Sequence, residues 1–231
     1  MNPRATVARD GPRTAVLRQA WSVGAATGAY GTSFGALAVA SGLSLAQAVA
    51  LSLLMFTGGS QFAFVGVIGA GGSGVAAVAA SGLLGVRNGF YGLQMTALLH
   101  PDRARRPLAA HLTIDESTAV GSAQVAAHPD RPDLVRTGFW TTGWAVFTLW
   151  NLSTLVGAVV GDALGDPRRY GLDAAAAAAF LALLWPRLGA GRTRLVALTA
   201  GAVALALVPA APPGVPVLAA AVVAVVAGWR A

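Results

Sequence analysis

The chain of 231 residues contains no cysteine and no lysine, and only 11% of its residues are charged. The absence of cysteine excludes disulfides, thiolate metal ligands and cysteine nucleophiles. Soluble domains carry roughly 25% charged residues, more than twice the fraction found here. Hydrophobic residues make up 55% of the chain, and the mean hydropathy is +0.64. The composition therefore predicts a membrane protein.

The net charge of +7 comes from arginine alone. Most arginines lie in the N-terminal tail and between apolar runs, where they would set orientation and contact the anionic lipid of a bilayer. A nucleic-acid partner is not predicted, because it would need these charges gathered on one soluble face. Residues 1–15 are predicted to form a basic cytoplasmic tail, and residues 16–231 a single transmembrane transporter domain.

Apolar runs follow one another along the whole chain and predict an all-α, polytopic membrane helix bundle with about seven to eight transmembrane helices. The first run is long and rich in glycine, so it is expected to be a retained helix rather than a cleaved signal. Asp173 is placed to cap the sixth helix. The predicted spans cover residues 16–40, 45–68, 75–99, 107–127, 135–160, 173–186, 195–208 and 215–229.

Small residues recur at helical spacing in two of these runs and predict faces that a neighbouring helix can approach closely. In the first run they are Gly24, Gly28, Gly31, Gly35 and Ala38, and in the third they are Gly82, Gly85, Gly89 and Gly92.

The second run is interrupted by paired glycines between polar residues, and this pattern predicts a broken helix near residues 57–61. The freed amides and polar side chains of a broken helix must line a cavity or be buried against protein. The predicted interruption consists of Thr57, Gly58, Gly59, Ser60 and Gln61.

Arg87 is the only arginine inside a long apolar run. A charged side chain at membrane depth is costly and normally faces a bundle interior or a water-filled cavity, so Arg87 is a predicted functional residue. Tyr91 and Gln94 follow on the same helical stripe, and Asn88 is its neighbour in sequence. Asp115 and Glu116, near the middle of the fourth run, are the other charges that enter a predicted span.

These groups together would suit a zwitterion. The amides of a broken helix and an arginine fork can hold a carboxylate, while an acid can hold an ammonium group or relay a proton. A structural ion pair between Arg87 and either Asp115 or Glu116 explains the same residues equally well.

The chain resembles the AzlC family, the large subunits of branched-chain amino acid exporters. Segments that carry the resemblance occur in the family's order: residues 28–38, 58–61, the Arg87 segment ending in Tyr91 and Gly92, the pair Asp115 and Glu116, and residues 171–173. Members usually show Asn-x-Arg-His before the Tyr-Gly pair, whereas residues 85–88 here are Gly-Val-Arg-Asn. The family's Thr-Asp-Glu begins with Ile114 in this chain.

The resemblance implies export of valine, leucine and isoleucine across a bacterial cytoplasmic membrane, by proton coupling or exchange, together with a small AzlD-type membrane subunit. Thr57, Gly58, Gly59, Ser60, Gln61, Arg87, Asn88 and Tyr91 are the predicted substrate-binding residues, and Asp115 and Glu116 the predicted proton-relay or amine-binding residues. No Walker loop is present, so direct ATP use is not expected. Neither an enzyme activity nor a cofactor is predicted, and the three histidines do not have metal-ligand spacing.

Two other classes of protein remain as alternatives. A non-catalytic membrane scaffold would use Arg87 and the acids for folding alone. An intramembrane serine protease would use Ser60 as nucleophile, but it needs a histidine at the same depth to take the serine proton. His111 and His128 lie at the ends of their run and are poorly placed for this role.

Overall fold

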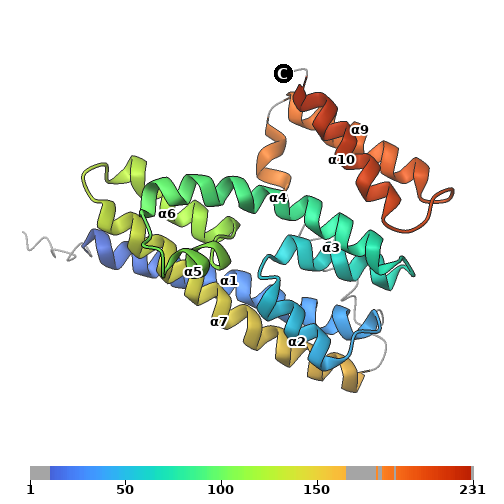
Figure 1. Cartoon of the computed structure of the whole chain (residues 1–231), viewed down its shortest axis with the longest axis horizontal. Helices are drawn as coiled ribbons and strands as arrows, with labels where there is room; N and C mark the ends of the chain where they lie inside the picture. Colours follow the sequence, from blue (N-terminus) through green and yellow to red (C-terminus); the bar gives the residue numbers. More distant parts are fainter. Residues whose placement is uncertain (1–10, 165–180, 182–183, 190, 230–231) are drawn as a thin grey trace, which may run out of the picture. The chain divides into compact units, whose positions relative to one another are not determined.

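The computed structural model describes residues 11–164, 181, 184–189 and 191–229, and all regular elements within them are helices (Figure 1). The predicted all-α fold is confirmed for these residues, while the cap predicted at Asp173 lies outside them. The helices are α1 (Pro12–Ala40), α2 (Leu45–Leu54), α3 (Gly58–Gly69), α4 (Gly74–Leu99), α5 (Arg106–His111), α6 (Asp115–Ala127), α7 (Pro132–Leu164), the 3-10 helix η2 (Trp185–Gly189), α9 (Gly191–Leu207) and α10 (Val215–Trp229).

One helix of the described part, over Pro132–Ala163, is long and apolar enough to cross a membrane. Three shorter helices are also apolar: Leu45–Leu54, Gly58–Gly69 and Val215–Trp229. The number of crossings therefore stays a prediction.

Contacts divide the chain into two units, each described by itself below. Unit 1 comprises Met1–Thr27 and Asn88–Leu149, and unit 2 comprises Gly28–Arg87 and Trp150–Ala231. The boundaries fall inside α1, α4 and α7, so each of these helices contributes to both units.

The predicted broken helix is present in unit 2. A capping box between Ser44 and Gln47 starts α2, with the Gln47 amide donating to the Ser44 hydroxyl at 3.2 Å. The helix ends at Leu54, and α3 begins at Gly58. The interruption thus occupies residues 55–57, and residues 58–61 form the first turn of α3 rather than the break itself.

Gln61 closes the end of α2 from this first turn. Its Nε2 donates to the carbonyl oxygen of Met55 at 2.8 Å and lies 3.3 and 3.4 Å from those of Ser52 and Leu51. The last carbonyls of a helix have no donor within the helix. The Leu51 and Met55 carbonyls also accept from the backbone amides of Met55 and Thr57. The fully buried Gln61 amide adds a donor at this end of α2 and so stabilises the interruption.

Glycines let α1 and α7 meet backbone to backbone in unit 2. A Cβ atom on Gly35 would overlap the carbonyl oxygen of Thr154, and one on Gly157 would overlap that of Thr32. The small face predicted for the first run is confirmed at Gly31 and Gly35, which both lie against α7.

The glycine face predicted for the third run is mostly not in contact with another described helix. A Cβ on Gly82, Gly89 or Gly92 would meet no described atom within 4 Å, and only Gly85 of the predicted face has a neighbour, the hydroxyl of Ser60 at 3.6 Å. In unit 2 the first half of α4 packs instead on α3, through Ala77 and Ala80 against Val67.

The single helix predicted for residues 107–127 is wrong, because the chain forms α5 and α6 with a break at residues 112–114 in unit 1. The Ser117 hydroxyl accepts from the Ile114 amide at 3.1 Å and donates to the Leu112 carbonyl at 2.6 Å. Asp115 and Glu116 therefore begin α6 rather than lie at mid-helix. Acidic groups are favourable in a first helical turn, where they face the positive end of the helix dipole.

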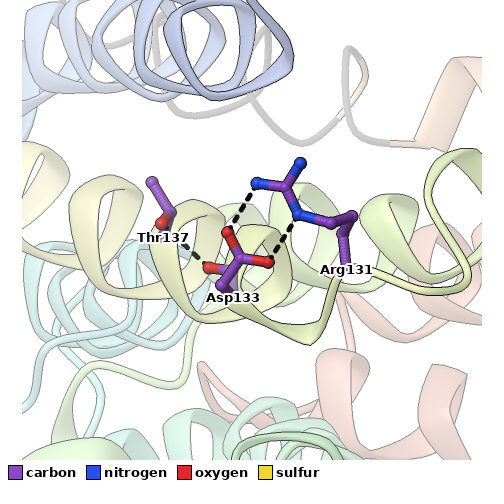
Figure 2. A network of polar contacts seen from close by, with 3 residues as sticks. All are labelled: Arg131, Asp133 and Thr137. Carbon is purple, nitrogen blue, oxygen red and sulfur yellow. Dashed lines mark hydrogen bonds and ion pairs between the residues drawn. The ribbon is translucent and has the colours of Figure 1, made fainter.

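The start of α7 in unit 1 is fixed by an exposed ion pair (Figure 2). Nε and Nη2 of Arg131 each donate to one carboxylate oxygen of Asp133 at 2.9 Å, and the Thr137 hydroxyl donates to the Asp133 carbonyl oxygen. The hydrogen bonds from Arg131 to Asp133 raise the pKa of Arg131 above its ordinary value.

Replacement of Gln61 tests how the interruption is held. Gln61→Ala would remove a buried hydrogen-bond donor from this end of α2, and a typical hydrogen bond contributes about 0.5–1.5 kcal/mol. For a chain of this size each kcal/mol lowers Tm by about 2–4 °C. Gln61→Glu should lower Tm further, because a carboxylate oxygen would then face the same carbonyl oxygens, and both accept hydrogen bonds. Thermal unfolding of the purified protein measures both, with Gln94→Ala at an exposed position of α4 as control. An unchanged Tm in both Gln61 variants would contradict this role.

Candidate functional site

The first turn of α3 in unit 2 presents free backbone donors. The amides of Gly58, Gly59 and Ser60 come before the first intrahelical hydrogen bond, which runs from the Gln61 amide to the Thr57 carbonyl at 3.0 Å. Thr57 occupies the N-cap position, yet its side chain makes no capping hydrogen bond. An uncapped helix start of this kind is a favourable place for an anion.

The guanidinium group of Arg87 lies directly on this turn. A Cβ atom built on Gly59 would stand 2.8 Å from Nη2, 3.2 Å from Nη1 and 3.4 Å from Cζ of Arg87. Only a glycine at residue 59 leaves room for the Arg87 guanidinium so close to the backbone of α3. The two positive features, a helix start and an arginine, therefore favour negative charge at the same place, and the arginine fork matches a carboxylate.

Ser60 adds a buried hydroxyl to these donors. The residue is 1% exposed, and Oγ has no hydrogen-bond partner within the described part of the chain. A buried polar atom left unsatisfied costs about 1–3 kcal/mol. Such an atom in a functional protein is a candidate ligand contact.

An aromatic cluster lines the turn on its apolar side. Trp150 stacks on Phe34 with ring centroids 6.0 Å apart, and Phe62 meets both rings edge-on at 6.2 and 5.7 Å. A Cβ on Gly58 would lie 3.0 Å from Cη2 of Trp150, so the cluster begins where the helix begins. The turn therefore has charged and hydrogen-bonding groups beside an apolar wall, which suits a small amphipathic ligand.

The structure brings together Gly59, Ser60 and Arg87 of the predicted site. Thr57 and Gly58 flank them at the start of α3, whereas the amide nitrogen of Gln61 is engaged at the end of α2. The sequence did not indicate Phe34, Phe62 or Trp150, because aromatic residues are common in apolar runs and nothing local shows that these three meet.

The other predicted residues belong to unit 1, where all are half-buried. Asn88 and Tyr91 lie on α4, and Asp115 and Glu116 lie in the first turn of α6. Tyr91, Asp115 and Glu116 each interact with another residue, and so does Arg87. Their predicted roles in substrate or proton binding, and the alternative ion pair of Arg87, stay predictions.

No group of three or more metal-ligating side chains occurs in the described residues. These features define an all-α protein of membrane composition that carries an interrupted helix and an arginine whose guanidinium lies against the start of the second part of that helix.

The profile of the AzlC protein family matches residues 22–164, more than half of the chain, and the chain belongs to this family. The matched segment includes the whole of α2, α3 and α4, with Arg87 and the first turn of α3. No curated protein and no solved structure matches the chain. Membership confirms the predicted family and identifies the chain as a membrane-transport subunit.

Replacement of Gly59 tests ligand binding at this turn separately from the stability of the helix packing. In Gly59→Ala the new methyl group meets the movable end of a side chain, so Arg87 shifts while the helices stay in place. We expect a Tm close to that of Gly66→Ala, whose Cβ has open space on the same helix. In Gly35→Ala the methyl group meets backbone, and overpacking of this kind costs about 1–3 kcal/mol.

Thermal unfolding of the three variants measures this difference, and binding of a small carboxylate, followed as thermal stabilisation, measures the site. Gly59→Ala should bind the carboxylate at least about tenfold more weakly, equivalent to about 1.4 kcal/mol. Normal carboxylate binding by Gly59→Ala would show that Arg87 does not act at this turn.

Proposed function

We propose that the chain is the large subunit of a secondary transporter that exports branched-chain amino acids. The observation that carries this proposal is the position of the Arg87 guanidinium on the uncapped first turn of α3, beside the buried Ser60 hydroxyl. Valine, leucine and isoleucine each combine a carboxylate with a short aliphatic side chain. The site offers groups for both parts.

The carboxylate would be held by the amides of Gly59 and Ser60, the Ser60 hydroxyl and the Arg87 fork. Each of these groups donates hydrogen bonds, and together they supply the positive potential that a carboxylate needs after leaving water. The amides and the Ser60 hydroxyl are held in place before the substrate arrives, because α3 is anchored at Gln61 and packed on α4. Preorganisation of this kind reduces the cost of binding.

The aliphatic side chain would lie against the aromatic cluster of Phe34, Phe62 and Trp150. All three rings are buried, and the ring of Trp150 lies next to Gly58. Apolar contact with these rings would favour branched aliphatic side chains over polar ones, because burial contributes about 25 cal/mol per Å² of apolar surface.

Interrupted helices in both units support a transport mechanism. Discontinuous helices with exposed amide and carbonyl ends are typical of secondary transporters. Unit 2 contains the break between α2 and α3, and unit 1 contains the break between α5 and α6. We propose that Asp115 and Glu116, at the second break, relay the protons that drive export, with exchange of amino acids as the alternative coupling.

The setting of the transporter is part of the same proposal. We infer a multi-pass protein of the bacterial cytoplasmic membrane that works with a small AzlD-type subunit. Membership in the AzlC family supports the membrane setting and the small subunit. The serine protease alternative lacks support, because no described base is hydrogen-bonded to the Ser60 hydroxyl.

Export of labelled leucine and valine tests the proposal. Cells expressing the chain with its small subunit should export both, and Arg87→Ala should reduce export at least about tenfold by removing a buried charge partner of the substrate. Arg87→Lys should recover little, because lysine lacks the bidentate fork. Asp115→Asn should reduce the dependence of export on the proton gradient.

Arg131→Ala is the control, because this arginine lies in an exposed ion pair outside the site. All variants are compared at equal membrane abundance. If the chain were only a scaffold, the wild type would be present in the membrane at normal abundance, but the cells would export neither leucine nor valine. That result would contradict the proposal.

A further inference from the structure

The helices α2 and α3 run back along each other, so the two ends of this segment lie together in unit 2. A Cβ atom on Gly69, the last residue of α3, would stand 2.5 Å from Oγ and 3.8 Å from Cα of Ser41, which lies shortly before α2. At the other end of the pair, Gln61 in the first turn of α3 donates to the Met55 carbonyl at the end of α2. The chain therefore turns round at residues 55–57 and returns to the level at which it began.

Neither helix of this pair is long enough to cross a membrane. Both are apolar, with 10 residues in α2 and 12 in α3. At the rise of an α-helix these numbers correspond to about 15 and 18 Å. The hydrocarbon core of a bilayer is about 30 Å thick, so each helix reaches about halfway through it. Placed end to end they could cross, but the contact between Gly69 and Ser41 excludes that arrangement.

The long helix α7 shows how deep the pair reaches, because its stretch Pro132–Ala163 is long and apolar enough to cross a membrane. The turn between α2 and α3 lies near the middle of this stretch, where a Cβ on Gly58 would stand 3.0 Å from Cη2 of Trp150. The end of α1 lies near the end of α7, where a Cβ on Gly161 would stand 2.8 Å from Cα of Ala36. From residue 150 to residue 161, α7 rises by about 16 Å, which is close to the length of α2.

We propose that α2 and α3 form a re-entrant hairpin, which enters and leaves the membrane at one face and holds the first turn of α3 at half the depth of the bilayer. Irregular backbone at this depth must be satisfied within the protein, and the buried Gln61 amide donates to the carbonyls at the tip. Residues 45–68, predicted above as one of the spans, would then not cross the membrane.

The hairpin gives the proposed substrate site its place in the membrane. The Arg87 guanidinium and the Ser60 hydroxyl lie at its tip, and secondary transporters bind their substrates near the midplane, where either face can be reached in turn. Only this assignment of a substrate to the tip rests on the proposed function. The depth of the tip follows from the contacts of α2 and α3 with each other and with α7.

Single cysteines can test the path of the hairpin, because the chain has no cysteine of its own. Ala46 in the first turn of α2, Ala70 after α3 and Thr14 at the start of α1 are all exposed. In cells that express the full chain with a cysteine-free small subunit, a membrane-impermeant maleimide should label Ala46→Cys and Ala70→Cys from the same face, and Thr14→Cys from the other. Labelling of Ala46→Cys and Ala70→Cys from opposite faces would overturn the inference, as would labelling of all three from one face.

Spin labels on exposed residues measure the depth of the tip in reconstituted vesicles. Leu54, beside the tip, is 79% exposed, and Leu152, near the middle of α7, is a matched control that is 56% exposed. The ratio of collisions with oxygen to collisions with a polar nickel chelate rises toward the bilayer centre. Labels at Leu54→Cys and Leu152→Cys should give similar, high ratios, and labels at Ala46→Cys and Ala70→Cys low ones. A ratio at Leu54→Cys as low as at Ala46→Cys would place the hairpin on the membrane surface and overturn the inference.

Both measurements follow the hairpin and do not depend on transport. Residues 46 and 70 at one face and residue 54 at half depth, in a chain that exports no leucine, would contradict the proposed function and leave the re-entrant hairpin in place. Leucine export by a chain whose residues 46 and 70 meet opposite faces would overturn the hairpin alone.

Discussion

A helix that stops inside a buried region leaves carbonyl groups at one end and amide groups at the other, and the site depends on how each set is satisfied. The carbonyl end of α2 is closed by the side chain of Gln61. The amide end of α3 is not closed by the side chain of Thr57. This asymmetry makes the interruption stable and at the same time keeps donors available for a ligand.

Glycines, which have no side chain, allow the charged and aromatic groups to lie close to these donors. Gly59 lets the Arg87 guanidinium rest on the turn, and Gly35 and Gly157 let α1 and α7 approach until Phe34 and Trp150 stack. Neither arrangement follows from side-chain attraction alone, because a single methyl group would displace it. Close packing through small residues is the usual means by which membrane helices approach one another.

Local patterns in the sequence were sufficient to predict the all-α fold and the interruption of the second run, and they selected Arg87, whose role stays a prediction. Each of these depends on neighbours along one helix, through paired glycines or an isolated charge. The small face of the first run was also predicted correctly, and the structure places Gly31 and Gly35 of that face against α7. Such features need no knowledge of long-range contacts.

Features that depend on a particular hydrogen-bond partner were not predicted. The break before Asp115 arises because the Ser117 hydroxyl bonds to Leu112 and Ile114, and a serine in an apolar run does not reveal which backbone groups it will bind. The hydrogen bonds from the Gln61 amide nitrogen to the end of α2 were not predicted, and the role of Gln61 in substrate binding stays a prediction. Trp150 could not be selected from the sequence, because its role comes from rings far away along the chain.

Recognition of a carboxylate at the first turn of α3 is the central claim, and analogues of leucine that keep only one charged group test it most directly. Thermal stabilisation of the purified protein would be compared for leucine, for 4-methylpentanoate, which keeps only the carboxylate, and for isoamylamine, which keeps only the amine. Leucine and 4-methylpentanoate should stabilise the wild type, isoamylamine should not, and Arg87→Ala should lose the response to 4-methylpentanoate. Stabilisation by isoamylamine as strong as that by leucine, with no response to 4-methylpentanoate, would contradict the claim.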